Sequence, residues 1–117
     1  MDFAGKNILV VGLGESGAAA SRWLDRQGAH VTVSEKRHES ELDRGVITEL
    51  SDAGIHLEFG GHRIETFLKA DLIVISPGVP LDIQPLKEAS MKGVPLVGDF
   101  EVAGRYVKMP AVAVTGT

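Results

Sequence analysis

Three runs of consecutive apolar residues recur along the chain, and each is followed by a turn that contains glycine. They are Ile8–Val11, Leu72–Ile75 and Ala111–Val114. An unbroken apolar run of this length is typical of a central parallel strand that is covered on both faces. Shorter apolar segments at residues 30–33, 55–58 and 94–97 bring the number of predicted strands to six.

Segments of mixed polar and apolar residues separate these strands and predict helices. The long ones span residues 16–27, 40–53 and 82–92. A glycine follows each of them directly, and glycine is the usual helix stop because it enters the left-handed conformation without a steric penalty. Two shorter helices are expected at residues 63–68 and 100–106, and Asp99 would cap the second.

Strands and helices alternate along the whole chain, and this alternation predicts the fold class. It favours a single Rossmann-like α/β domain, with a parallel sheet of five to six strands and helices on both faces. A length of 117 residues suits one hydrophobic core. In the strand order 3-2-1-4-5-6, a crevice opens at the carboxyl ends of strands one and four, where this fold binds its ligands.

A glycine-rich turn follows the first strand directly and leads into the first helix. Residues 12–17 read Gly-Leu-Gly-Glu-Ser-Gly, which fits the G-x-G-x-x-G pattern in the context that it requires. The first glycine permits the tight turn, the second lets phosphate approach the backbone, and the third packs the helix on the strand. The amides near Glu15, Ser16 and Gly17 would bind a diphosphate. The alternative is a glycine turn used only for packing.

Two further positions face the same predicted crevice. Glu35 ends the second strand, where an acidic residue in this fold accepts hydrogen bonds from the nucleoside of the ligand. The donor is a ribose hydroxyl if the ligand is NAD, or an N–H of the base if the ligand is another nucleotide. Ser76-Pro77-Gly78 ends the fourth strand, and Gly78 would bring a backbone amide to the ligand. The alternatives are an exposed loop carboxylate at Glu35 and a turn at residues 76–78 that merely ends a strand.

Composition narrows the range of functions. The net charge of −4 and the single adjacent basic pair, Lys36-Arg37, argue against nucleic acid as a partner. The chain has no cysteine, no signal peptide and no membrane-length apolar run, so a cytoplasmic location is expected. We expect surface or loop roles, without metal, for the histidines His30, His38, His56 and His62. No catalytic set is evident, so the domain is predicted to bind rather than catalyse.

Several short patches, in this order and spacing, resemble the N-terminal domain of the Mur ligase family, and of its D-glutamate-adding branch in particular. They are Gly5-Lys6, the turn at residues 12–17, residues 70–74, 76–79 and 97–99, and Val112-Ala113-Val114-Thr115-Gly116-Thr117. Family members continue from Thr-Gly-Thr into a central ATP-binding domain. The resemblance therefore implies a UDP-substrate-binding domain at residues 1–110 and a truncated start of the ATP-binding domain at residues 111–117.

The resemblance also implies a substrate and a set of contacts. The substrate is UDP-N-acetylmuramoyl-L-alanine, whose diphosphate would be held by Leu13, Gly14, Glu15, Ser16 and Gly17. Glu35 and Lys36 would meet the uracil, Arg37 would line the same rim, and Gly78 would approach the diphosphate and sugar. ATP, Mg²⁺ and the partner domains of the ligase would lie beyond residue 117. The chain alone is expected to bind UDP compounds weakly and to have no ligase activity.

The main alternative is the NAD-binding domain of a dehydrogenase or a sensor. The turn at residues 12–17 and Glu35 would serve a dinucleotide equally well. Thr115-Gly116-Thr117 and the residues 76–79 and 97–99 favour the ligase, because a dehydrogenase has no reason to carry them together. A structural or interaction domain with an empty cleft is a second alternative, but the sequence offers no exposed aromatic cluster or amphipathic stripe for it.

Overall fold

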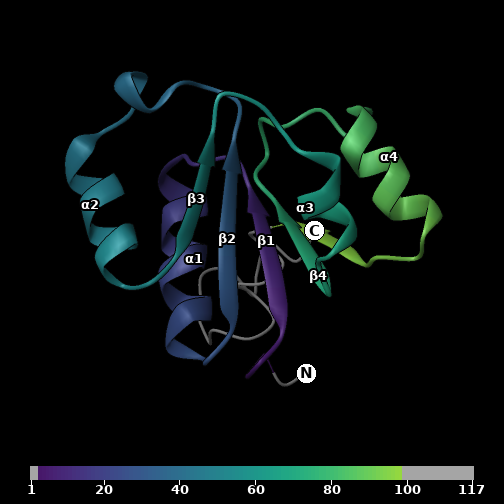
Figure 1. The fold of residues 1–117 in the computed structure, drawn as a ribbon, viewed down its shortest axis with the longest axis horizontal. Helices are drawn as coiled ribbons and strands as arrows, with labels where there is room; N and C mark the ends of the chain where they lie inside the picture. The colour runs from purple at the N-terminus through teal and green to yellow at the C-terminus, as the bar shows by residue number, and fades with distance from the viewer. Residues whose placement is uncertain (1–2, 99–117) are drawn as a thin grey trace, which may run out of the picture.

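The computed structural model describes residues 3–98, which form a three-layer α/β domain (Figure 1). The elements in chain order are β1 (Asn7–Val11), α1 (Glu15–Arg26), β2 (His30–Glu35), the 3₁₀ turn η1 (Glu39–Glu41), α2 (Arg44–Asp52), β3 (His56–Phe59), α3 (Ile64–Leu68), β4 (Leu72–Ile75), α4 (Gln84–Met91) and β5 (Leu96–Gly98). The predicted fold class is confirmed. The predicted helix at residues 100–106, the strand at 111–114 and the domain boundary at residue 110 lie outside the described residues.

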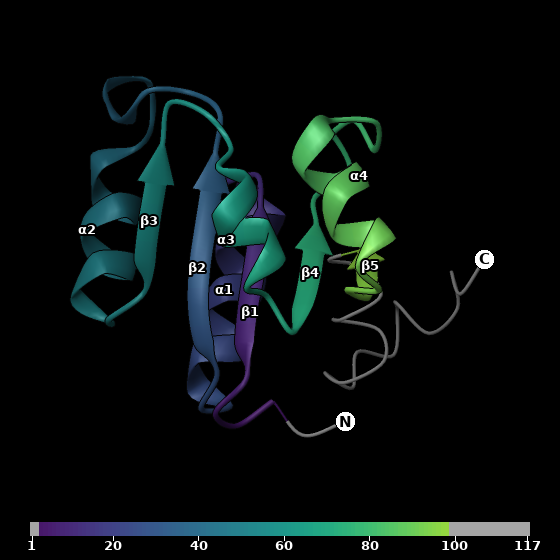
Figure 2. The same ribbon diagram turned by 45° about the vertical axis from the view of Figure 1, so that its right-hand side comes forward.

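The sheet has the order β3-β2-β1-β4-β5, and every paired strand is parallel to its neighbour. The arrowheads of β2, β3 and β4 accordingly point the same way in Figure 2. This is the predicted order as far as the fifth strand. Because β1 pairs with β2 on one side and with β4 on the other, the chain changes direction across the sheet at β1, and the crevice is expected at that point.

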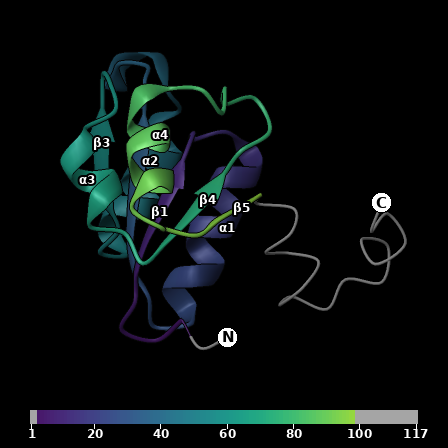
Figure 3. The same ribbon diagram turned by 90° about the vertical axis from the view of Figure 1, so that its right-hand side faces the viewer.

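Alternate residues of β1 supply two separate cores. Ile8 and Val10 join the cluster that contains Leu24 of α1 and Leu50 of α2, whereas Leu9 and Val11 join the cluster of Phe67, Leu86 and Ala89 from α3 and α4. Figure 3 shows α3 and α4 lying together, apart from α1. Successive side chains of a strand point to opposite faces, so an unbroken apolar strand must be covered on both faces, as the sequence predicted.

The predicted helix at residues 40–53 is wrong in its first part. Residues 39–41 form the 3₁₀ turn η1, and α2 begins only at Arg44. The carboxylate of Asp43 accepts a 2.8 Å hydrogen bond from the backbone N–H of Gly45, and this cap starts a new helix. The other helix and strand boundaries within residues 3–98 differ from the predicted ones by at most two residues.

Candidate functional site

The glycine turn lies at the carboxyl end of β1. The backbone N–H of Gly12 donates a 2.9 Å hydrogen bond to the carbonyl of Ser34 at the end of β2, and Gly12 has a φ of +96°. A side chain at this φ would be strained, so the first glycine has the turn-forming role that the sequence predicted.

The third glycine of the motif packs the helix against the turn. A Cβ atom at Gly17 would clash with the carbonyl oxygen of Gly12 and would lie 3.1 Å from the hydroxyl oxygen of Ser76. That Ser76 hydroxyl donates a 3.2 Å hydrogen bond to the same Gly12 carbonyl. The turn after β4 is thereby joined to the turn after β1, and Gly17 lies buried beneath both. Its predicted packing role is confirmed.

Neither the backbone conformation nor the packing of the protein requires a glycine at the second position of the motif. Gly14 has φ −98° and ψ −167°, a conformation open to other residues, and a Cβ atom there would meet nothing within 4 Å. Gly14 is the N-cap of α1, and no side chain caps the helix. The first N–H groups of a helix have no intrahelical partners and carry its positive dipole. The amides of residues 15–17 can therefore receive an anion.

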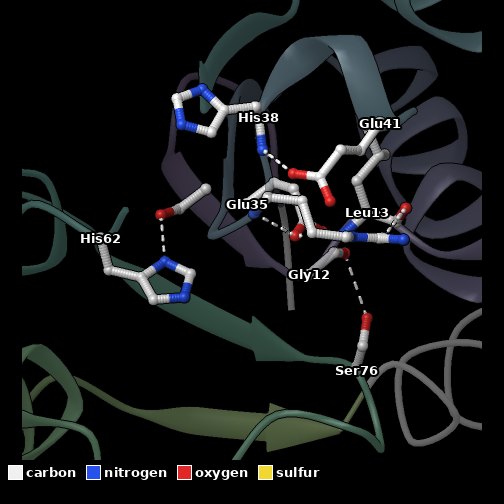
Figure 4. A network of polar contacts seen from close by, with 9 residues as sticks. Gly12, Leu13, Glu35, His38, Glu41, His62 and Ser76 are labelled. Carbon is white, nitrogen blue, oxygen red and sulfur yellow. Dashed lines mark hydrogen bonds and ion pairs between the residues drawn. The ribbon is translucent and has the colours of Figure 1, made fainter. Parts of the chain in front are cut away.

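The carboxylate of Glu35 is buried at the end of β2 and is fully hydrogen-bonded (Figure 4). Oε1 accepts from the backbone N–H of Leu13 at 2.8 Å and from Nη2 of Arg37 at 3.2 Å. Oε2 accepts from the backbone N–H and from Nε of Arg37, at 2.8 and 3.0 Å. A carboxylate offers about four acceptor positions, so none is left for a ligand in this arrangement.

These contacts stabilise the ionised form of the Glu35 carboxyl. Burial by itself would raise the pKa of the Glu35 carboxyl, but the side-chain hydrogen bonds of Arg37, the backbone N–H groups of Arg37 and Leu13, and the charge of Arg37 together lower it to about 2. The hydrogen bonds and charge of Glu35 in turn raise the pKa of the Arg37 guanidinium. The pair therefore stays ionised at neutral pH, and its Arg37 end is 44% exposed.

A cleft of about 380 Å³ connects these parts. It brings together seven of the predicted site residues, namely Leu13, Gly14, Ser16, Glu35, Lys36, Arg37 and Gly78. Glu15 and Gly17 do not line it. Glu15 is exposed and lines a neighbouring groove together with Arg22 and Glu41. The backbone N–H of Leu13 is already bound to Glu35.

His62 also lines the cleft, whereas its position in the sequence predicted only a surface or loop role. It follows β3 in a loop, is half-buried, and its Nδ1 lies 2.6 Å from the hydroxyl oxygen of Ser34. The only signal in the sequence is its position after a predicted strand end, next to the glycines at residues 60 and 61. That signal does not distinguish a site residue from an ordinary loop histidine.

Among residues 3–98, no three His, Asp or Glu side chains are grouped so that they could hold a metal ion. No helix within that range has the length and apolar character needed to cross a membrane.

The parallel sheet, the glycine turn and the cleft at its carboxyl edge define a Rossmann-like α/β domain. Residues 6–98 match the family model described as Mur ligase MurD-like, N-terminal domain, and the chain belongs to this family.

Curated relatives agree with this assignment. The UDP-N-acetylmuramoylalanine--D-glutamate ligase of Desulfosudis oleivorans is 48% identical over 112 residues, which are 96% of this chain and 24% of that protein. The protein of the same name from Koribacter versatilis is 48% identical over 117 residues, which are 100% of this chain and 26% of that protein. The chain thus spans about a quarter of the length of these relatives.

Solved structures of ligases share the fold. A pseudomurein peptide ligase type C from Methanothermus fervidus is 30% identical with a TM-score of 0.72, over 91% of this chain and 21% of that one. UDP-N-acetylmuramate-alanine ligase MurC from Thermotoga maritima has a TM-score of 0.67 at 23% identity, over 82% of this chain and 21% of that one. At that lower identity the likeness shows the fold alone.

Proposed function

We propose that this chain anchors the UDP end of UDP-N-acetylmuramoyl-L-alanine for an ATP-dependent ligase that adds D-glutamate during cytoplasmic peptidoglycan precursor synthesis. The names of the relatives at 48% identity support the substrate and the reaction. The observation that carries the binding role is a pair of glycines in the cleft, Gly14 and Gly78, which the protein itself does not require.

Neither glycine is explained by conformation or by packing. Both have φ values outside the left-handed region, and a Cβ atom at either position would meet nothing within 4 Å. Both line the cleft, one at the N-terminus of α1 and the other after β4. A glycine that neither conformation nor packing requires is typical of a site where a ligand approaches the backbone closely.

The ligand contacts follow from the donors of the cleft and of the adjoining N-terminus of α1. The amides of Glu15, Ser16 and Gly17 and the hydroxyl of Ser16 would hold the diphosphate, with Gly78 on the opposite wall. Lys36 and Arg37 would lie at the uracil end. Leu13 would contribute through its position in the turn, since its N–H is bound to Glu35. A direct contact between Glu35 and the uracil stays a prediction, and it would require Arg37 to release one carboxylate oxygen.

The same saturated carboxylate counts against the NAD alternative. A dinucleotide domain uses the acidic residue after β2 to accept hydrogen bonds from ribose hydroxyls. All four acceptor positions of Glu35 are occupied by Leu13 and Arg37. A ligand recognised through donors of the protein, such as a diphosphate with a carbonyl-bearing base, suits this site better.

In the whole ligase, ATP would phosphorylate the L-alanine carboxylate, and the amine of D-glutamate would then attack the acyl phosphate. Among residues 3–98, no three His, Asp or Glu side chains are grouped to hold a metal ion. Because the chain spans about a quarter of the length of its relatives, we infer that ATP and Mg²⁺ bind to the rest of such a ligase. The chain 1–117 should therefore show no ATP-dependent turnover with UDP-N-acetylmuramoyl-L-alanine and D-glutamate, and turnover would refute this division of roles.

Calorimetric titration of the chain with UDP-N-acetylmuramoyl-L-alanine, UDP and NADH tests the proposal. Both UDP compounds should bind more tightly than NADH, and the reverse order would overturn it. The Gly14→Ala variant should keep its melting temperature and lose UDP affinity by about tenfold or more, because the new methyl group lies where phosphate would approach. Gly45→Ala on α2, away from the cleft, is the matched control and should bind as the wild type does.

A further inference from the structure

Two contacts position the imidazole ring of His62 in the cleft. Its Nδ1 lies 2.6 Å from the hydroxyl oxygen of Ser34, and its ring packs edge-on against Phe67 with the ring centroids 5.7 Å apart. Ser34 and Phe67 are both fully buried. The imidazole is therefore contacted on two sides by fully buried side chains, which favour a single orientation of the ring.

The contact with Ser34 decides which ring nitrogen carries the proton. The Ser34 side chain has no other hydrogen-bond partner among residues 3–98. A buried hydroxyl that donates to nothing is costly, so Ser34 donates to Nδ1, and Nδ1 must be the unprotonated nitrogen. Burial lowers the pKa of His62, which outweighs the opposing effect of Glu35, and Lys36 adds to the lowering. The ring is neutral, and its proton lies on Nε2.

The remaining N–H of His62 has no partner among the described residues. In Figure 4, one ring nitrogen of His62 is joined to the serine hydroxyl and the second lies on the other side of the ring. This side chain lines the same cleft as Lys36, Arg37 and Ser76. It stands beside the end of β2, where Rossmann-like folds bind the nucleoside, whereas the diphosphate binds at the N-terminus of α1.

We propose that His62 is a specificity-determining residue whose Nε2–H donates a hydrogen bond to an oxygen of the nucleoside half of the ligand. This inference rests on the proposed function. The acceptor is an oxygen of either the pyrimidine or the ribose, because Nε2–H can only donate and the carboxylate of Glu35, at the same end of the cleft, is already saturated. Where that oxygen is O4 of uracil, the donor selects uracil over cytosine, which has an amino group at position 4.

The test compares variants that separate the role of Nδ1 from the role of Nε2. His62→Phe keeps the packing on Phe67 and removes both nitrogens. His62→Asn can reach Ser34 but not the cleft, whereas His62→Gln extends an amide N–H to the position of Nε2. His56→Phe, at a histidine that is 68% exposed on β3, is the matched control. Each variant of the 117-residue chain is titrated with UDP, CDP and inorganic pyrophosphate, and its fold is checked by circular dichroism.

We expect His62→Phe and His62→Asn to lose UDP affinity by about five- to tenfold, the effect of one hydrogen bond. His62→Gln and His56→Phe should stay within about twofold of the wild type, and no variant should change the binding of pyrophosphate. A loss confined to UDP assigns the contact to O4 of uracil, and an equal loss for UDP and CDP assigns it to O2 of the pyrimidine, which both bases carry, or to the ribose. Unchanged UDP binding by His62→Phe, or an equal loss for pyrophosphate, would overturn the role of His62.

A second measurement is independent of the variants. Long-range ¹H–¹⁵N spectra of the wild type should show Nδ1 unprotonated and Nε2 protonated, and the Nε2 signal should move when UDP is added. A proton on Nδ1 would overturn the inference even if UDP binds. If the wild type binds no UDP compound at all, the proposed function fails, and that outcome is distinct from UDP binding that ignores His62.

Discussion

The carboxylate of Glu35 accepts a 2.8 Å hydrogen bond from the backbone N–H of Leu13, which lies 22 residues earlier in the chain. The contact ties the end of β2 to the glycine turn after β1. Nε of Arg37 donates a hydrogen bond to the same carboxylate, and Nη2 of Arg37 donates one of 3.3 Å to the carbonyl oxygen of Leu13. The shape of the turn therefore depends on an acidic side chain whose position in the sequence suggests a ligand contact.

Glu35→Gln should destabilise the domain by about 1.5 kcal/mol at pH 7, because an amide cannot accept all the donors that now meet the carboxylate. We take the lower end of the range for charged hydrogen bonds, since solvent screens the exposed end of Arg37. Urea unfolding of both proteins measures the difference.

The difference between Glu35→Gln and the wild type should also depend on pH. The pKa of Glu35 is lowered from 4.5 to about 2 in the folded protein, so its contribution is complete above pH 4.5 and is lost as the pH falls toward 2. The gap between the two unfolding free energies should close over that window. A gap of equal size at pH 7 and pH 2.5 would contradict the role of the charge.

Gly17→Ala should destabilise the domain by about 2 kcal/mol or more. The added Cβ atom would clash with the carbonyl oxygen of Gly12, and both groups belong to the backbone, so the turn must move. Alanine normally stabilises a helix relative to glycine. Thermal unfolding of Gly17→Ala beside Gly14→Ala, which has open space for its methyl group, separates the packing glycine from the cleft glycine. A Gly17→Ala protein as stable as the wild type would refute this account.

Ser76→Ala should cost about 1 kcal/mol, the usual net effect of one hydrogen bond. The hydroxyl of Ser76 donates to the carbonyl of Gly12 and joins the turns after β4 and β1. Ser90→Ala, at an exposed serine of α4, is the control and should change the free energy of unfolding by less than about 0.5 kcal/mol. Chemical denaturation measures the free energy of unfolding of both variants. Equal changes in Ser76→Ala and Ser90→Ala would show that the hydrogen bond of Ser76 does not stabilise the domain.

Phe67→Leu should lower both stability and UDP affinity. The smaller side chain leaves a gap in the core of α3 and α4, at a cost of about 1–2 kcal/mol, and removes the ring against which His62 packs. Ile47→Val on α2 should cost about 1 kcal/mol without changing UDP binding. Calorimetry at a temperature where both variants are fully folded checks the contrast. Unchanged UDP binding by Phe67→Leu would show that Phe67 does not position His62.

Much of the fold could be predicted because the signals are local. The apolar run at Ile8–Val11, the glycine turn that follows and the glycines after the helices depend only on neighbouring residues. The alternation of strands and helices predicted the parallel sheet, and the strand order is the one expected for a Rossmann-like fold. The helix at residues 40–53 was predicted too long because Asp43, one polar residue among several, caps a new helix and breaks the segment in two.

The site was only partly predictable. Glycine spacing alone indicated the anion-binding turn, because the tight turn, the approach of a phosphate and the packing of a helix each require a missing side chain at a fixed position. The family could also be recognised from the order and spacing of short motifs. The sequence by itself thus determined the fold class, the family and the place of the cleft.

Only the tertiary structure decided what the polar side chains do there. Glu35 is bound to Leu13 across 22 residues, His62 to Ser34 across 28, and Ser76 to Gly12 across 64. Such contacts depend on which strands are neighbours, on their register and on the face to which each side chain points, and spacing along the chain fixes none of these for residues in separate elements. For that reason the sequence identified the acidic residue but not its partners, and it missed the histidine.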